Sequence, residues 1–348
     1  MHWSEYSSII RKRGDKYSKR LENLINSLNW VEELAEQRGV DRIVFLGDFF
    51  DTPNLNASEI SALQEVVWSN IPHDFIVGNH EIQLENLQIS SAHLFNLIPN
   101  SHVVDTPTMD GGFGYNLLYL PYCKEENRVS IKDTIKNCME GYFTTQEVKR
   151  TIAFSHNDVK IQYGLMPPTM GYDIEDIDNS CHLFLNGHLH NGGKFSKNGY
   201  NVGNLTGQNF GEDANKYEHG VMIVDVDTLT IETIINPYAF NFYKIEINDS
   251  IDELLFLFKC NKIKNNAIVT IKTPENLVQQ VKELLENYSS IVKEYRVVAL
   301  PNKTKVGDEE NGEVVIESIN HLDEFITFVK DTIEMTPMVI EELSEVCR

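Results

Sequence analysis

The stretch RIVFLGDFFD at residues 42–51 decides which fold this chain adopts. It begins with a short apolar run, which is typical of a buried strand, and Gly47 and Asp48 follow the run directly. Apolar residues recur at helical spacing ahead of it, and Gly39 stands where that helix should stop. The pattern predicts a helix over residues 15–38 and then a buried strand that delivers a carboxylate at its carboxyl end.

Three later strands are predicted to end in the same way, in polar residues that follow an apolar run. They lead to GNHE at residues 78–81, SHN at residues 155–157 and GHLH at residues 187–190. In layered α/β folds, ligands lie outside the carboxyl ends of the strands, so polar residues at several strand ends can converge. We therefore expect the four motifs to form one site. A predicted helix over residues 56–69, with a capping-box pattern at its start, separates the first two motifs.

The residue types in these motifs are those of a metal site. Carboxylate, amide and imidazole ligands suit manganese, iron or zinc rather than a soft thiolate site. Two such ions that share a carboxylate can generate hydroxide and clamp the attacking and leaving oxygens of a phosphoryl group. Each motif alone is weaker evidence, because a Gly-Asp pair is often only a tight turn and a single histidine such as His156 is more often structural. Four motifs in this order, each behind an apolar strand, argue against coincidence.

After residue 200 the pattern changes to shorter β segments. Residues 221–235 predict a hairpin, and from about residue 242 strands and helices alternate in what we expect to be a small separate α+β domain. Residues 302–313 are polar and charged, as in a linker, and a helical pattern follows them. The predicted organisation is a main domain over residues 1–241, the small domain over residues 242–301, a linker over residues 302–316 and a helical segment over residues 317–348.

The composition is that of a folded and strongly acidic protein. The 348 residues carry 52 Asp and Glu against 30 Lys and Arg, a formal net charge of -22. Proteins that hold nucleic acid through their own overall field are usually basic, so this balance counts against a chain that binds DNA alone. A basic partner subunit or bound divalent cations would offset the charge.

Nothing in the sequence predicts export or a membrane anchor. The five cysteines are odd in number, widely separated and never in a Cys-x-x-Cys pair, which indicates reduced thiols. No apolar run approaches the roughly 18 residues that span a bilayer, and the first residues do not have the form of a signal peptide. We expect a cytoplasmic protein that does not associate with membranes.

In type, order and spacing, the four motifs resemble the second to fifth signatures of the calcineurin-like metallophosphoesterases, over about residues 15–235. Two further segments, VGNLTGQNFGE at residues 202–212 and LPY at residues 120–122, are similar to segments of SbcD-type nucleases. The resemblance implies an α/β fold, a four-layer αββα sandwich, with a small α+β capping domain and C-terminal helices. It also implies two divalent metal ions, with manganese expected.

The resemblance carries a role onto each matching residue. Asp48 would bridge two metal ions, and His80 would protonate or steady the leaving oxygen. The remaining ligands would be Asn79, His156 and His188 on one ion and His190 on the other. Asp51 could orient a ligand or serve as a carboxylate at the start of a helix, and Glu81 is expected to be structural or to orient a ligand.

One signature of the resemblance is absent. The family opens with a strand that ends in Asp-x-His, whose two side chains hold the first metal ion, and no such strand precedes Met1. Either the chain is truncated or starts late, or its first metal site is incomplete and the sheet lacks a central strand. His2 is a candidate for a remaining ligand, although its place beside a flexible chain end counts against this role.

The resemblance implies a DNA exonuclease or endonuclease subunit that works with an SbcC-like coiled-coil ATPase in recombination, repair or replication. Such a subunit would act on DNA as a homodimer, and its helical segment over residues 317–348 would dock on the ATPase. The composition resembles that of phage-encoded members. Two alternatives stay open: a phosphodiesterase or phosphatase that acts on nucleotides or phosphoproteins, and a non-catalytic subunit that lost its chemistry with the first metal site.

Overall fold

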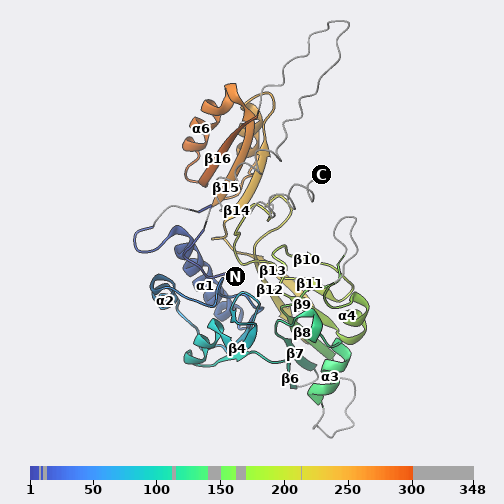
Figure 1. The fold of residues 1–348 in the computed structure, drawn as a ribbon. Helices are drawn as coiled ribbons and strands as arrows, with labels where there is room; N and C mark the ends of the chain where they lie inside the picture. Colours follow the sequence, from blue (N-terminus) through green and yellow to red (C-terminus); the bar gives the residue numbers. More distant parts are fainter. Residues whose placement is uncertain are drawn as a thin grey trace, which may run out of the picture. The chain divides into compact units, whose positions relative to one another are not determined.

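The computed structural model of the chain divides into two compact units, Met1–Asn302 and Lys303–Arg348. The residues that it describes are 1–7, 9–10, 14–111, 115–139, 150–161, 170–212 and 214–300. The predicted linker and helical segment, residues 302–348, therefore lie outside the described residues. Figure 1 shows the ribbon of the first unit, with many of its helices and strands labelled.

The first sheet has three parallel strands, in the order β1-β2-β5. Its strands are β1 (Ile43–Phe45), β2 (His73–Ile76) and β5 (Ser101–Val104). Two helices, α1 (Lys19–Arg38) and α2 (Ala57–Leu63), share a core with its outer face. This core is aromatic: the rings of Phe75 and Phe95 stack with centroids 3.7 Å apart, and both side chains are buried.

Local signals fix the ends of α1, whereas tertiary contacts shorten α2. The Ser18 hydroxyl accepts a hydrogen bond from the Leu21 N–H, and Gly39 ends α1 in the left-handed conformation, as its place in the sequence predicted. The prediction that the second helix reaches residue 69 was wrong, because α2 ends at Leu63. Beyond it, the N–H groups of residues 67 and 69 donate to the side chains of Asn29 and Glu32 on α1 instead of continuing the helical ladder.

The second sheet has six strands, in the order β10-β11-β9-β8-β7-β6. They are β6 (Thr108–Gly111), β7 (Tyr115–Leu120), β8 (Arg150–Ser155), β9 (Leu183–Asn186), β10 (Gly193–Lys194) and β11 (Gly199–Asn201). The four central strands are parallel, and β6 and β10 are antiparallel at the edges. Helices α3 (Ile131–Met139) and α4 (Ile174–Ser180) pack on one face through a core that includes Leu118, Ala153 and Phe184.

The two sheets face each other, so the main body has four layers. Ile76 and Val104 of the first sheet share a buried cluster with Tyr119, Ile152 and Leu185 of the second. With α1 and α2 outside one sheet and α3 and α4 outside the other, the layers run helix, sheet, sheet, helix. This confirms the predicted α/β fold class.

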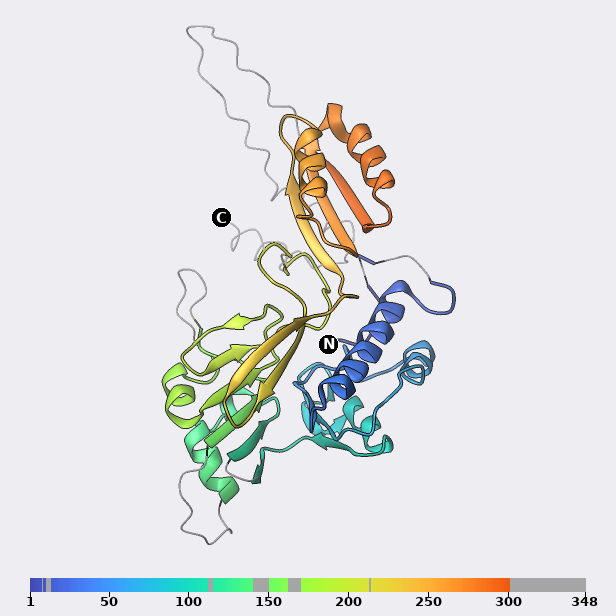
Figure 2. The same cartoon turned by 180° about the vertical axis from the view of Figure 1, so that it is seen from behind.

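A hairpin and several short elements complete the main body. The hairpin β12 (Gly220–Asp225) and β13 (Thr230–Ile235) packs with Val221 on the cluster beneath α1 and with Met222 on the cluster between the sheets. Figure 2 shows this hairpin and α1 from behind. The short elements are β3 (Ile82–Gln83), β4 (Asn86–Ser90), and the 3₁₀ helices η1 (Ser91–Leu97) and η2 (Glu125–Asn127).

The first residues of the chain run parallel to the loop that follows β1. The His2 N–H donates to the Asp48 carbonyl at 2.7 Å, and the Trp3 N–H donates to the Phe49 carbonyl at 2.6 Å. The Trp3 side chain is fully buried, and its indole N–H donates to the Glu59 carbonyl at 3.0 Å. These contacts fix the backbone on both sides of His2.

A third sheet follows the main body, with three parallel strands in the order β14-β15-β16. Its elements are β14 (Asn241–Glu246), α5 (Asp252–Lys259), β15 (Ala267–Pro274), η3 (Glu275–Leu277), α6 (Val278–Asn287) and β16 (Val292–Leu300). Parallel neighbours need a crossover connection, which α5 and α6 supply. The sheet and its helices share a core of their own that includes Tyr243, Leu254 and Val281.

No helix among the described residues is long and apolar enough to cross a membrane. The four cysteines within the described part of the chain, Cys123, Cys138, Cys181 and Cys260, are free thiols, in agreement with the spacing argument.

The aromatic core beneath α1 yields a test of the fold. Phe75→Ala removes a ring that is 1% exposed and that stacks on two others, so it should lower the free energy of unfolding by about 3–5 kcal/mol. Leu97→Ala, at a side chain that is 81% exposed, is the matched control and should change it by less than about 0.5 kcal/mol. Urea unfolding followed by tryptophan fluorescence suits the measurement, because all three tryptophans, Trp3, Trp30 and Trp68, lie in this half of the chain.

Candidate metal centre

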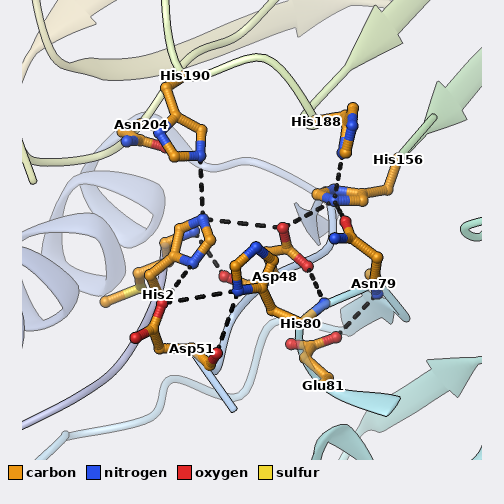
Figure 3. A network of polar contacts seen from close by, with 12 residues as sticks. His2, Asp48, Asp51, Asn79, His80, Glu81, His156, His188, His190 and Asn204 are labelled. Carbon is orange, nitrogen blue, oxygen red and sulfur yellow. Dashed lines mark hydrogen bonds and ion pairs between the residues drawn. The ribbon is translucent and has the colours of Figure 1, made fainter. Parts of the chain in front are cut away.

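Each predicted site residue lies just beyond the carboxyl end of a strand. Asp48 follows β1, Asn79 and His80 follow β2, His156 follows β8, and His188 and His190 follow β9. Figure 3 shows these side chains gathered around Asp48. The first sheet thus contributes the carboxylate, the amide and the imidazole of His80, and the second contributes the imidazoles of His156, His188 and His190.

Glycine precedes the ligands because there is no room for a side chain. A Cβ on Gly47 would lie 2.3 Å from the ring of His156, and the φ angle of Gly47 is +76°. A Cβ on Gly78 would lie 2.2 Å from Oδ1 of Asp48 and 2.4 Å from its backbone nitrogen. The two glycines let the strand ends approach closely enough for their ligands to meet.

The first group of ligand atoms surrounds Nε2 of His156. This nitrogen lies 3.0 Å from Asp48 Oδ2, 3.2 Å from Asn79 Oδ1 and 3.2 Å from His188 Nδ1. Asp48 and His156 are buried, and His188 is partly exposed. The four side chains come from four strand ends and point at one another.

The tautomer of His156 that the Leu46 carbonyl selects makes this group fit a cation. Its Nδ1 lies 2.6 Å from the Leu46 carbonyl oxygen, which can only accept, so Nδ1 carries the proton. In neutral His156 the Nε2 lone pair then faces a carboxylate oxygen and an amide oxygen, which are also acceptors. Acceptors that meet without a hydrogen between them need a positive charge at their centre, and this donor set suits a divalent transition metal.

A second group lies on the other side of Asp48. His2 Nε2 is 3.1 Å from His190 Nε2 and 3.7 Å from Asp48 Oδ2. His2 donates from Nδ1 to Asp51 at 2.9 Å, and His190 donates from Nδ1 to Glu212 at 3.1 Å. Both Nε2 lone pairs therefore face each other near the oxygen of Asp48 that also faces His156. This places Asp48 between the two groups, where a bridging ligand would stand.

Each of the four imidazoles has one nitrogen held by an oxygen acceptor and the other directed at the cluster. For His188 the acceptor is Asp158, whose Oδ1 lies 3.2 Å from Nε2. Carboxylates and carbonyls in this position fix the tautomer and the ring orientation of a metal-binding histidine. Glu212 is itself held, because it is buried and accepts hydrogen bonds from Asn204 Nδ2 and the Gln208 N–H, both at 2.9 Å.

The protonation states of the buried groups also suit metal binding. Burial lowers the pKa of His2 to about 3, against the opposing effect of its hydrogen bond to Asp51. His2 is therefore neutral at physiological pH and keeps a lone pair for a ligand. Burial raises the pKa of Asp48, but its close contact with His156 Nε2 and the hydrogen bond from the His80 N–H outweigh this effect. The net pKa of Asp48 is lowered, so the carboxylate is ionised.

His80 lies at the open side of the cluster. Its side chain is 43% exposed, and its ring centroid is 4.6 Å from that of His2. Nδ1 donates to the Asp51 carbonyl at 3.1 Å, and the His80 backbone N–H donates to Asp48 Oδ1 at 2.9 Å. These two hydrogen bonds orient the His80 ring beside the ligand side chains and leave its Nε2 atom available to exchange a proton.

The geometry decides between the alternatives for Asp51 and clarifies Glu81. Asp51 orients His2 and does not start α2, whose cap is Asn56. The hydrogen bond from His2 lowers the pKa of Asp51 against the effect of burial. Glu81 is buried and accepts from the N–H groups of Phe50 and Gly78, so it ties the loop after β1 to the loop after β2. Burial, followed by repulsion from Asp48, raises the pKa of Glu81 to about 7.

Sequence reasoning missed or undervalued three residues that the structure brings to the cluster. The sequence makes His2 only a candidate metal ligand. Its contact with the cluster depends on the pairing of the first residues with residues 48–50, and no sequence pattern indicates that pairing. Glu212 stood within a segment noted for its resemblance, but no orienting role was assigned to it. Asp158 directly follows the SHN motif. A carboxylate beside a ligand motif is a signal for a group that orients a ligand, and this signal could have identified Asp158.

The structure also offers another grouping of ligand atoms. His2, Asp51 and His80 present one atom each within 4.8 Å of one another, as do Asp48, His156 and His188. In the first trio, Nδ1 of His2 already donates to Asp51, which leaves Nε2 as its lone-pair atom. We therefore favour the arrangement in which His2 presents Nε2 toward His190 and Asp48.

Comparison with protein families gives a match over the part of the chain that carries this site. Comparison with curated proteins gives no match. The family of calcineurin-like phosphoesterases matches residues 9–192, which is more than half of the chain and includes Asp48, Asn79, His156, His188 and His190. That family uses divalent metals for phosphoester hydrolysis. The fold, the strand-end ligands and this match together identify the chain as a member of the calcineurin-like phosphoesterase family.

Proposed function

We propose that the chain is a metal-dependent DNA exonuclease or endonuclease of the SbcD type, and that it works with an SbcC-like ATPase in recombination, repair or replication. The observation that carries the proposal is the pair of ligand groups on either side of Asp48. Two divalent ions bound there, manganese by preference, would supply an activated water and would neutralise the charge of a phosphodiester.

The protein's own residues have separable tasks in this reaction. Asp48, Asn79, His156 and His188 form one ligand set, and His2 and His190 contribute to the other. Asp51, Asp158 and Glu212 hold the imidazoles in the ligand tautomer. In its imidazolium form His80 would carry a second proton at Nε2 for the leaving oxygen, because Nδ1 already donates its own proton to the Asp51 carbonyl.

DNA is favoured over smaller esters by features outside the ligand set. The segment over residues 202–212 is similar to that of SbcD-type nucleases, and it contains Asn204 and Glu212, which support His190. The sheet β14-β15-β16 adds a body that a small-molecule phosphodiesterase does not need. The net charge of -22 calls for a partner that supplies a basic surface, as an ATPase subunit would. We propose a homodimer with such a partner docked on residues 317–348, in the manner of phage-encoded members.

Two other functions compete with this one. A phosphodiesterase or phosphatase for nucleotides or phosphoproteins would use the same ligands, and a non-catalytic subunit would keep the fold without turnover. Cleavage of linear duplex and single-stranded DNA, compared with hydrolysis of cyclic nucleotides and 4-nitrophenyl phosphate, separates the first from our proposal. Measurements of metal content and of turnover together distinguish a non-catalytic subunit from the proposed nuclease.

Manganese-dependent cleavage of linear DNA should be lost when the shared carboxylate is removed. Asp48→Asn keeps the shape of the side chain but withdraws the charge between the two ligand groups, so both the metal content and the cleavage should fall to background. His102→Asn, at an imidazole that is 63% exposed on β5, is the control and should cleave like the wild type. Metal analysis and a nuclease assay on end-labelled DNA provide the measurements. Full activity of Asp48→Asn would exclude this site.

Glu212→Gln should weaken one metal position without abolishing the fold. The substitution removes the charge that holds His190 in the ligand tautomer, and the loss of such an orienting group costs about 10–100-fold in metal affinity or activity. Glu218→Gln, at a side chain that is 49% exposed, is the matched control. Calorimetric titration of the metal-free protein with manganese measures both. Equal affinities in the two variants would contradict the orienting role.

His80→Asn should lower kcat and leave the metal content intact. The imidazole is placed to give a proton and not to bind an ion, so the rate on DNA should fall by about 10²–10⁴-fold. The loss should be much smaller on bis(4-nitrophenyl) phosphate, because a nitrophenolate leaves without a proton. An equal loss on both substrates, or a loss of metal, would rule out the acid role.

A further inference from the structure

We propose that Tyr122 is a stacking platform for the nucleobase beside the scissile phosphodiester, which makes an unpaired or fraying nucleotide the substrate. The inference rests on the proposed nuclease function and names the substrate class of the same site. Tyr122 is neither a ligand nor an orienting group in the cluster described above. It is a positioning residue for the nucleotide and takes no part in the bond-breaking step.

The ring of Tyr122 stands next to a metal-binding imidazole. Its centroid lies 6.4 Å from that of His188, and the two planes are tilted by 34°. Both side chains are only partly buried, so they lie at the rim of the cluster where a substrate would enter. A nucleotide whose phosphate is at the ligand atoms would have its base within reach of this ring.

The loop that carries Tyr122 is pinned to both sheets. The Tyr122 N–H donates to the Val77 carbonyl at 3.0 Å, two residues before Asn79. The next N–H, that of Cys123, donates to Asn157 Oδ1 at 2.9 Å, one residue after His156. The platform is therefore fixed to the two strand ends that hold Asn79 and His156, and its backbone cannot shift without disturbing them.

A buried arginine fixes the other side of the same loop. The Arg128 side chain donates to the Cys123 carbonyl at 3.0 Å and to Asn157 at 3.3 Å, and its guanidinium lies 4.9 Å from the centre of the Tyr172 ring. Only 6% of this side chain is exposed. A rigid support of this kind favours a function for a partly exposed aromatic ring, because less conformational entropy is then lost when the ring contacts a ligand.

The chemistry of the ring suits a base better than a phosphate. The phenol ring is uncharged at physiological pH and offers an apolar π face, whereas it has no cationic group for a phosphate. Stacking of a base on an aromatic side chain is tolerant of sequence, since every base has a π face. A base can stack on protein only after it leaves its own stack, which selects single-stranded or fraying positions.

The test uses single-stranded oligonucleotides in which one nucleotide at a time is replaced by an abasic analogue. Cleavage by the full chain with manganese is mapped at single-nucleotide resolution. The wild type should cut the bond beside the abasic position about tenfold more slowly, as expected for the loss of one base stack. Tyr122→Ala should cut the ordinary oligonucleotide about tenfold more slowly and should show no further penalty at abasic positions. Tyr122→Phe should keep the wild-type profile.

Each outcome separates the stacking role from a structural one. A uniform loss in Tyr122→Ala, with the abasic penalty retained or the manganese content reduced, would mean that Tyr122 merely supports His188, and the inference would be overturned. A wild type that cuts DNA without an abasic penalty would overturn the inference and leave the nuclease proposal intact. A wild type that hydrolyses only small esters would overturn both. If the Tyr122→Ala variant fails to fold, Tyr122→Leu replaces it with the same two outcomes, because a leucine side chain keeps bulk at this position but has no π face.

Discussion

The whole site depends on one electrostatic constraint, which is that acceptor atoms converge on Asp48 with no proton to share. The Leu46 carbonyl accepts the Nδ1 proton of His156, so in the neutral ring the Nε2 lone pair faces Asp48 and Asn79. The same holds for His2 and His190, whose protons go to Asp51 and Glu212. Such an arrangement is repulsive by itself and becomes favourable with cations at its centre. The polar residues around it are best understood as the framework that keeps these atoms in place.

The backbone contributes to this framework at a cost. Asp48 and His2 both have left-handed backbones, with φ angles of 47° and 56°. Non-glycine residues in this region cost of order 1–3 kcal/mol each, so neighbouring contacts must hold them. The buried Trp3 and the pairing of residues 2–3 with residues 48–49 hold His2, and the His80 N–H holds the Asp48 side chain. Strain of this kind is common where a side chain must point in one direction.

Much of the fold could be predicted from the sequence because its signals are local. The same is true of five candidate ligand residues, which are Asp48, Asn79, His156, His188 and His190. An apolar run followed by Gly-Asp or Gly-Asn-His predicts both a strand end and a ligand, and the layered fold then brings the ends together. His2 could not be assigned in this way, since its role comes from pairing with a segment 46 residues further along the chain, as the bond from its N–H to Asp48 shows. The early end of α2 had a similar cause, because side chains of α1 took the N–H groups that a longer helix would have used. Glu212 illustrates the same limit, as nothing near it in the sequence points to His190.

The ligands are drawn from both sheets, and this has a consequence for the mechanics of the protein. Asp48 and Asn79 belong to the first sheet, whereas His156, His188 and His190 belong to the second. Metal ions bound at this site would connect the two sheets of the sandwich. Their binding energy would add to the cohesion of the folded state, by about 2.7 kcal/mol for an ion at a hundred times its dissociation constant. The catalytic activity and the free energy of unfolding would then both increase with the concentration of free metal ion around the protein.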